Sequence, residues 1–144
     1  MNKVNVLFLC TANSVRSQIA EAFLRSYACD KYEAYSAGLD PKEIHPLTSR
    51  VMGEIGIDIS GQYSKALKNY MGSIHFGYLI TVCSKAEERC PTVFPGMGQR
   101  LHWDLDDPVK VGGSEEERLN KFREVRDQIK KRVQKWVDRQ IQDT

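Results

Sequence analysis

Short apolar runs alternate along this chain with segments in which apolar residues recur every three or four positions. The apolar runs predict β-strands at residues 4–10, 32–38, 76–83 and 99–105. The periodic segments predict α-helices at residues 17–28, 45–57, 64–71 and 114–141. The first run, VNVLFLC, is apolar on both sides, as in a strand whose sheet is covered by helices on both faces. This order predicts an α/β fold, a three-layer sandwich in which a small open parallel sheet of about four strands has helices on both faces.

Two of the predicted helices indicate which side faces the core. The helix at 114–141 opens with Ser114 and Glu117 in the S-x-x-E spacing of a capping box. Its apolar positions recur at steps of three and four, at Leu119, Phe122, Val125, Ile129, Val133 and Trp136. The helix at 17–28 has the same spacing, at Ile19, Ala20, Phe23, Leu24 and Tyr27. Basic residues in the last helix are interleaved with acidic ones, which favours a solvated face over a nucleic-acid surface.

Length and charge exclude several classes of protein. At 144 residues the chain is the size of one domain, so we expect residues 1–144 to form a single unit. The net charge of +2, from 21 basic and 19 acidic residues, is too small to draw the protein onto nucleic acid or an anionic membrane. The N-terminal apolar run is too short to span a bilayer and has no signal cleavage site, so we expect a cytoplasmic protein, and a monomer.

A polar turn between the first strand and the first helix is the main candidate for chemistry. Cys10 ends the strand, at the edge of the sheet where ligands of parallel sheets bind, and Arg16 begins the helix. Backbone N–H groups of the turn would form a nest for a tetrahedral oxyanion, with contributions from Thr11, Ala12, Asn13, Ser14 and Val15. Arg16 would close the nest with a bidentate fork, and Ser17 would donate its hydroxyl to the Cys10 sulfur. The same positive field would lower the pKa of Cys10 and make it a nucleophilic thiolate at neutral pH.

The other cysteines leave more than one interpretation open. Four cysteines are too few for a disulfide scaffold in a chain of this length, so they are thiols with chemistry or packing roles. Cys83 ends a predicted strand at the same edge as Cys10, and Cys90 follows after the segment SKAEER. A pair of structural cysteines and a zinc pair with His102 are alternatives, although C-x6-C is not a common zinc spacing. We expect Cys29 to be a packing residue.

These motifs resemble a known family. CTANSVRSQIAEAF resembles the phosphate-binding loop of the low-molecular-weight protein tyrosine phosphatase superfamily. The remainder is similar to its thioredoxin-coupled arsenate reductase branch through YSAG, GIDIS, TVCSKAEERCP, HWDLDDP and FREVRDQIKK, in that order. The resemblance covers nearly the whole chain. It implies a low-molecular-weight phosphatase-like fold, arsenic detoxification as the role, no bound cofactor or metal, and electrons supplied by thioredoxin.

The resemblance also implies a relay of three thiols. Cys10 attacks arsenate, Cys83 attacks Cys10 and releases arsenite, and Cys90 attacks Cys83 to leave a disulfide for thioredoxin. If residues 84–89 are helical in the reduced protein, the two sulfurs are too far apart to bond, so the segment must unwind. Gly96 and Gly98 are candidates for absorbing that motion. A glutaredoxin or mycothiol system remains an alternative reductant.

An Asp-Pro pair supplies the candidate general acid. Asp107 is held extended by Pro108, and the resemblance places it where it can protonate the leaving oxygen. Without the resemblance, this pair would be read as an ordinary turn. The resemblance further implies that phosphatases of the superfamily have an aromatic slot just after this pair, and PVKVGG provides no aromatic residue. An aryl phosphatase acting through a phosphocysteine, and a non-catalytic oxyanion-binding or redox-sensing module, remain the alternatives.

Some relatives bind a potassium ion beside the loop. Three positions of that cation site match here, Asn13, Glu21 and Ser36. The fourth position is Lys65, so our hypothesis is that its ammonium group replaces the cation. The loop itself departs from the family pattern at Ala12, where glycine is frequent, and at Val15, where cysteine is common.

Overall fold

The computed structural model describes residues 3–90 and 97–142 of the chain. Within these residues the elements follow in the order β1 (Val4–Cys10), α1 (Arg16–Ala28), β2 (Tyr32–Gly38), α2 (Pro46–Glu54), η1 (Leu67–Asn69), β3 (Phe76–Thr81), α3 (Ser84–Arg89), β4 (Met97–His102), η2 (Pro108–Lys110) and α4 (Glu115–Gln142). The two η elements are short 3-10 helices. None of the described helices has both the length and the apolar character needed to cross a bilayer. Gly96, one of the two expected hinge glycines, lies outside the described residues.

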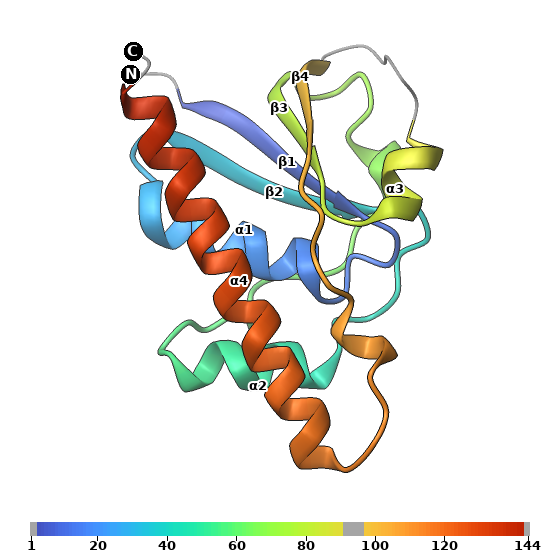
Figure 1. The fold of residues 1–144 in the computed structure, drawn as a ribbon. Coiled ribbons are helices and arrows are strands. Elements are labelled where there is room, and N and C mark those ends of the chain that lie inside the picture. The colour runs from blue at the N-terminus through green and yellow to red at the C-terminus, as the bar shows by residue number, and fades with distance from the viewer. Residues whose placement is uncertain (1–2, 91–96, 143–144) are drawn as a thin grey trace.

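The four strands form one parallel sheet in the order β2-β1-β3-β4 (Figure 1). The register pairs Cys10 with Gly38 and Leu9 with Thr81, and Thr81 in turn pairs with His102. The carboxyl ends of the strands therefore meet at one edge of the sheet, where ligands of open parallel sheets bind. The predicted small parallel sheet is confirmed.

Helices and turns cover the two faces of this sheet. α1 and α4 pack together on one face, and α4 runs alongside α1 and α2 in Figure 1. The aromatic core on this side includes Trp136, whose ring centroid lies 5.0 Å from that of Tyr78 and 6.4 Å from that of Trp103. Tyr35 points to the opposite face and packs edge-on against Tyr70 and Phe76. α3 contacts β1 and β3 near their carboxyl ends. The predicted three-layer sandwich is thus confirmed.

The helix residues that the sequence predicted to be buried are buried in the structure, with two exceptions. The capping box is present, since Glu117 N–H donates to Ser114 Oγ at 3.2 Å and Ser114 N–H donates to Glu117 Oε1 at 3.4 Å. The six apolar positions expected to face the core from α4 are all buried. Tyr27 was expected to be buried and is 45% exposed, because its hydroxyl reaches out to Asp138 at 2.9 Å. Cys29 is also exposed, at the end of α1, so the expectation that it packs in the core is wrong.

The predicted helix at 64–71 is wrong in type and length. Only the short 3-10 helix η1 forms there. The residues before it are extended because they continue the sheet: Ala66 forms a parallel bridge with Gly38, and the Lys65 carbonyl accepts from Gly38 N–H at 2.8 Å. The helical spacing was therefore overridden by pairing with the end of β2.

Other element boundaries differ by a few residues for local reasons. α2 ends at Glu54 in a Schellman motif, in which Gly56 has φ 81° and Ile57 N–H donates to Met52 O at 3.0 Å. β4 ends at His102 rather than at residue 105. The apolar pattern extends further because Trp103 and Leu105 are buried after the strand has ended.

Candidate active site

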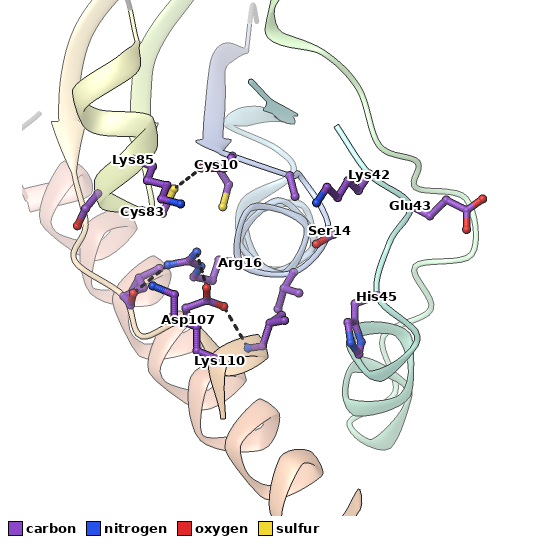
Figure 2. Close-up of a pocket in the computed structure, with 16 residues that line it drawn as sticks. Cys10, Ser14, Arg16, Lys42, Glu43, His45, Cys83, Lys85, Asp107 and Lys110 are labelled. Atoms are coloured by element: carbon purple, nitrogen blue, oxygen red, sulfur yellow. Dashed lines mark hydrogen bonds and ion pairs between the residues drawn. The ribbon is translucent and has the colours of Figure 1, made fainter. Parts of the chain in front are cut away.

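A pocket of about 570 Å³ opens at the carboxyl edge of β1 and β3. Its walls come from the loop after β1, the segment between β2 and α2, the start of α3 and the segment around η2. Figure 2 shows Cys10, Cys83, Arg16 and Asp107 around this one cavity. Four of the residues predicted to carry chemistry are therefore brought together, although they are separated by up to 97 positions along the chain, from Cys10 to Asp107.

The loop after β1 is bonded so that its amide groups face the pocket. Its carbonyls at Cys10, Thr11, Ala12 and Ser14 accept hydrogen bonds from the backbone N–H groups of Leu39, Asp40, Lys42 and His45, at 2.8–3.2 Å. In a trans peptide the N–H points opposite to the carbonyl of the preceding residue. The N–H groups that follow these carbonyls are thus directed inward. A row of inward-facing N–H groups is the arrangement that an oxyanion nest requires.

Asn13 sets the curvature of the loop from behind. It has φ 53°, and it is the one residue other than glycine with a positive φ among those the structure describes. Its side chain is fully buried, where Oδ1 accepts from Lys65 N–H at 2.9 Å and from Gln18 Nε2 at 3.0 Å. Its Nδ2 donates to Ser17 Oγ at 2.8 Å. Asn13 therefore holds the loop in shape, and its side chain does not line the pocket.

Gly38 is required where the loop passes over the end of β2. A Cβ at this position would lie 2.7 Å from the Thr11 carbonyl oxygen and 3.0 Å from Asn13 Cβ. These contacts are too short for any side chain. The absence of a side chain at Gly38 allows β2 and the oxyanion loop to lie in contact.

The amino end of α1 adds to the positive field of the pocket. Val15 is the N-cap residue and makes no side-chain capping bond, so the first N–H groups of the helix are not covered by a side chain. Such a helix end favours an anion. The nest and the helix end thus act on the same point in the pocket.

Arg16 and Asp107 lie next to each other at the wall of the pocket. Arg16 Nη1 donates to the Leu105 carbonyl at 3.2 Å, and Nη2 lies 3.6 Å from Asp107 Oδ2. Asp107 has the predicted extended backbone, with φ −94° and ψ 106°, and its Oδ1 accepts from Val109 N–H at 3.1 Å. A guanidinium group and a carboxyl group are therefore held side by side next to the candidate nucleophile.

Cys10 and Cys83 form a hydrogen-bonded pair of buried thiols. The bond from Cys10, together with the Thr11 hydroxyl at 3.3 Å and Ala86 N–H at 3.4 Å, lowers the pKa of Cys83 to about 5. The same bond to Cys83, and burial, raise the pKa of Cys10, while Arg16 and the Thr11 backbone N–H act in the opposite direction. Two adjacent buried thiols cannot both be ionised, so at neutral pH the pair holds one negative charge.

The neighbouring thiol adds a group that the sequence did not reveal. We predicted a Cys10 thiolate, and in the structure Cys10 shares one negative charge with Cys83, whose contact raises the pKa of Cys10 and lowers that of Cys83. When the hydrogen bond between the two thiols breaks, Arg16 and the backbone N–H of Thr11 favour a thiolate on Cys10. The sequence could not reveal this, because the neighbouring thiol comes from another strand.

Cys90 lies at the other end of α3 and does not line the pocket. It is buried, and burial raises its pKa, with Arg100 acting in the opposite direction and Glu87 in the same one. α3 is helical as expected from SKAEER. A helix rises about 1.5 Å per residue, so seven positions separate Cys83 and Cys90 by about 10 Å. This exceeds the distance of about 4.4–6.8 Å between the α-carbons of a disulfide.

This arrangement recurs in known proteins. Residues 5–144 match the family described as "Low molecular weight phosphotyrosine protein phosphatase". The chain belongs to this family. An arsenate reductase from Shouchella clausii is 40% identical over 139 residues, which cover 96% of this chain and 98% of the relative.

Two solved structures of arsenate reductases have the same fold within this family. One, described as an arsenate reductase in the phosphate binding state, is 33% identical with a TM-score of 0.74, and the match covers 94% of this chain and 98% of the other. A thioredoxin-dependent arsenate reductase from Corynebacterium glutamicum is 32% identical with a TM-score of 0.61, and the match covers 92% of this chain and 62% of that chain.

Several residues of this family member lie differently from what the sequence predicted. The predicted bond from Ser17 to the Cys10 sulfur is not among those of the described residues, and Ser17 instead accepts from Asn13. Lys42, His45, Lys85 and Lys110 also line the pocket and were not predicted. The first three follow the ends of β2 and β3, so the rule that ligands bind at the carboxyl ends of strands could have found them.

The four positions that the resemblance assigned to a cation site come together behind the loop. Lys65 Nζ lies 3.7 Å from Glu21 Oε1, and Ser36 Oγ donates to the same oxygen at 2.5 Å. Burial lowers the pKa of Lys65, and the Glu21 carboxylate opposes this. Lys65 is 9% exposed, and its backbone N–H is the group that holds Asn13. Its ammonium group thus faces the Glu21 carboxylate, and the replacement of a cation by Lys65 stays a hypothesis.

Proposed function

We propose that this protein reduces arsenate to arsenite and uses thioredoxin as its electron donor, as part of arsenic detoxification. The observation that carries the proposal is the Cys10–Cys83 thiol pair, which lies at an oxyanion loop. Hydrolysis through a phosphocysteine needs one thiol, whereas reduction of arsenic(V) needs two electrons from two thiols. The arsenate reductases that match the chain over nearly its whole length support the same function.

The first step is attack on the bound oxyanion. The loop amides and Arg16 hold arsenate, whose negative charge takes the place of the Cys83 thiolate as the partner of the positive field. The Cys10 sulfur then bonds to arsenic, and an oxygen leaves as water after Asp107 supplies a proton. The position of Asp107 beside Arg16 supports this role.

The second and third steps transfer the electrons. Cys83 attacks the Cys10 sulfur, the sulfur–arsenic bond breaks with its electron pair on arsenic, and arsenite leaves. Cys90 then attacks Cys83, and Cys10 leaves as a thiolate ready for the next turnover. The Cys83–Cys90 disulfide is the product that thioredoxin reduces.

The reductant and the physical state of the protein complete the proposal. Thioredoxin is supported by the likeness to the thioredoxin-dependent enzyme of Corynebacterium glutamicum, and a dithiol product suits dithiol exchange. We infer that residues 1–144 act as one domain, as a cytoplasmic monomer, without a bound cofactor or metal.

A coupled assay tests the function. NADPH oxidation is followed with thioredoxin, thioredoxin reductase and arsenate, for the wild type, Cys90→Ser and the control Cys29→Ser. We expect arsenate-dependent turnover in the wild type and in Cys29→Ser, because Cys29 is exposed and remote from the pocket. Turnover should be lost in Cys90→Ser. Absence of arsenate-dependent turnover in the wild type would overturn the proposal.

Hydrolysis of aryl phosphates is a second candidate, because the same nest, nucleophile and carboxyl group suit phosphate as well. After Asp107 the pocket wall is formed by Val109 and Lys110, and no Phe, Tyr or Trp is among the described residues that line it. We therefore expect slow hydrolysis of para-nitrophenyl phosphate. Rapid hydrolysis without arsenate reduction would favour a phosphatase whose other cysteines protect Cys10.

A further inference from the structure

α3, the helix between Cys83 and Cys90, depends on neighbouring elements for its stability. It has six residues, fewer than an isolated helix needs in water. Its amino end is capped by the Cys83 sulfur, which accepts from Ala86 N–H at 3.4 Å. Its carboxyl end is capped from β4, where Arg100 Nη2 donates to the Glu87 carbonyl at 2.6 Å and Nη1 to the Cys90 carbonyl at 3.4 Å. Arg100 thus satisfies carbonyls that a helix end leaves without partners.

The Glu87 side chain is fixed by the same region. Its carboxylate accepts from the Thr81 hydroxyl and lies 3.5 Å from Arg100 Nη2. His102 Nδ1 lies 2.8 Å from Thr81 Oγ1 and 3.8 Å from Glu87 Oε2. Thr81 ends β3, and Arg100 and His102 belong to β4. We call Arg100, Glu87, Thr81 and His102 the α3 clamp.

We propose that Arg100 and Glu87 are positioning residues for the last step of the relay, because the α3 clamp holds Cys90 away from Cys83 until the clamp opens. This inference rests on the proposed function, which requires a bond between Cys83 and Cys90. The helix keeps these sulfurs too far apart to bond, and the clamp contacts reach both the backbone and the side chain of Glu87. Opening of the helix therefore requires release of Arg100 from Glu87.

The chemistry of the relay weakens the opposite end of the helix first. When Cys83 bonds to Cys10, its sulfur loses its negative charge and becomes a poorer acceptor for Ala86 N–H. The α3 clamp then still holds the carboxyl end of the helix. Cys90 loses its proton to solvent and attacks Cys83, and the Cys10 sulfur leaves with the electron pair. Arg100, which faces Cys90, favours the thiolate that makes this attack.

The clamp should therefore shift a measurable equilibrium. The contacts of Arg100 with the carbonyls of Glu87 and Cys90 cap the folded helix, so they stabilise the dithiol form and not the disulfide form. Arg100→Gln removes charge-assisted hydrogen bonds to part-buried carbonyl acceptors. We expect the equilibrium constant for Cys83–Cys90 disulfide formation to rise about tenfold, which corresponds to about 30 mV for a two-electron couple.

The experiment isolates this couple from arsenate chemistry. In a Cys10→Ser, Cys29→Ser background, the protein is equilibrated with mixtures of reduced and oxidised dithiothreitol, and the disulfide fraction is measured by alkylation and mass spectrometry. Arg89→Gln is the matched control. Arg89 also lies on α3, but it pairs with Asp40 on the surface, at 2.8 Å, and exposed pairs contribute little. We expect less than a twofold shift for the control.

Two further variants guard against a folding defect. Arg100→Lys keeps the charge and should restore part of the wild-type equilibrium constant. Glu87→Gln removes the charge that faces Arg100 and should shift the constant in the same direction as Arg100→Gln. Hydrogen exchange of the Glu87 and Cys90 amides, which bond within α3, should be faster in both Arg100→Gln and Glu87→Gln.

The outcomes separate the clamp from the function. If the equilibrium constant for the Cys83–Cys90 disulfide is the same in Arg100→Gln, Glu87→Gln and the parent, the proposed role of the α3 clamp is overturned and the three-thiol relay stands. If no Cys83–Cys90 disulfide forms in the parent, the relay fails and the role assigned to the clamp fails with it.

Discussion

At the scale of single residues, the chemistry depends on groups that change each other's charge. Cys10, Cys83 and Arg16 come from different elements, yet the two thiols alter each other's ionisation and Arg16 favours the thiolate form of both. Either sulfur of the pair can carry the negative charge, and the positive groups of the pocket determine which one does. Attack on arsenate needs the charge on Cys10, and the following step needs it on Cys83. A shared proton allows both.

The shared charge predicts an early titration. The pKa of Cys83 is about 5 against an ordinary value of 9.0, so its thiolate is present above about pH 5. In a Cys29→Ser, Cys90→Ser variant, we expect thiolate ultraviolet absorbance from one sulfur per chain to appear with a midpoint near pH 5. Because the folded pKa is the lower one, the free energy of unfolding should rise between about pH 5 and 9 and fall as the pH drops through about 5. Cys10→Ala should move the midpoint upward, and a midpoint above pH 8 in the parent would contradict the prediction.

Asp107 is expected to act on the rate and not on binding. Asp107→Asn keeps the shape of the side chain but cannot supply the proton, so kcat should fall about 100-fold or more. The dissociation constant for arsenate, measured by calorimetry, should change less than threefold. Asp106→Asn is the control, because Asp106 is exposed and pairs with Lys121. Full activity of Asp107→Asn would remove this residue from the mechanism.

The buried ammonium group of Lys65 predicts that the activity of the enzyme does not depend on potassium. Its contacts with Glu21 and with the backbone carbonyl of Tyr63 place a positive charge of the chain itself beside this carboxylate. We expect kcat/KM to be the same, within twofold, in potassium and sodium salts at equal ionic strength. Strong activation by potassium would refute the hypothesis.

At the scale of elements, the site depends on how the ends of β1, β2 and β3 meet. The loop after β1 is supported by the chain that follows β2, since residues 39–45 supply hydrogen bonds to its carbonyls. α3 has only six residues, and its carboxyl end is capped by Arg100 from β4, whereas its amino end is capped by the sulfur of its own N-cap residue, Cys83. The first contact gives the oxyanion loop a fixed shape, and the second gives the relay a segment that can open.

The contact between β2 and the loop can be tested with one methyl group. Gly38→Ala would bring Cβ to 2.7 Å from the Thr11 carbonyl, so the loop must shift. We expect a loss of about 2 kcal/mol in the free energy of unfolding and at least tenfold weaker binding of phosphate, measured by denaturation and calorimetry. Gly53→Ala is the control, because nothing lies within 4 Å of its added Cβ in α2. It should leave phosphate binding unchanged and raise stability by up to about 1 kcal/mol.

At the scale of the whole molecule, a rigid scaffold carries one segment that can unfold. β1, α1 and α4 share the fully buried core, whereas α3 is short and held by polar contacts. After oxidation by arsenate, amides of α3 should exchange faster while those of β1 and α4 stay protected. Cys90 should become easier to alkylate in a form trapped at the Cys10–Cys83 stage. Unchanged exchange of α3 in the oxidised protein would contradict the unwinding.

Local patterns in the chain determined the parallel α/β sandwich and the oxyanion loop. The C-x5-R-S spacing between a strand and a helix predicts a nest because peptide geometry and helix ends act over a few residues. The capping box and the apolar face of α4 are local in the same sense, and both were found in the structure. These features need no information from distant parts of the chain.

The tertiary structure decided which groups meet. The sequence could place Cys83 at the same sheet edge as Cys10, but the charge on Cys83 depends on a sulfur and a hydroxyl from another strand and its loop. Residues 64–66 are extended and not helical because Gly38 offers them a place at the end of β2. The Arg100 cap joins β4 to a helix ten or more positions earlier. Side-chain contacts between elements depend on packing in three dimensions, and spacing along the chain does not encode them.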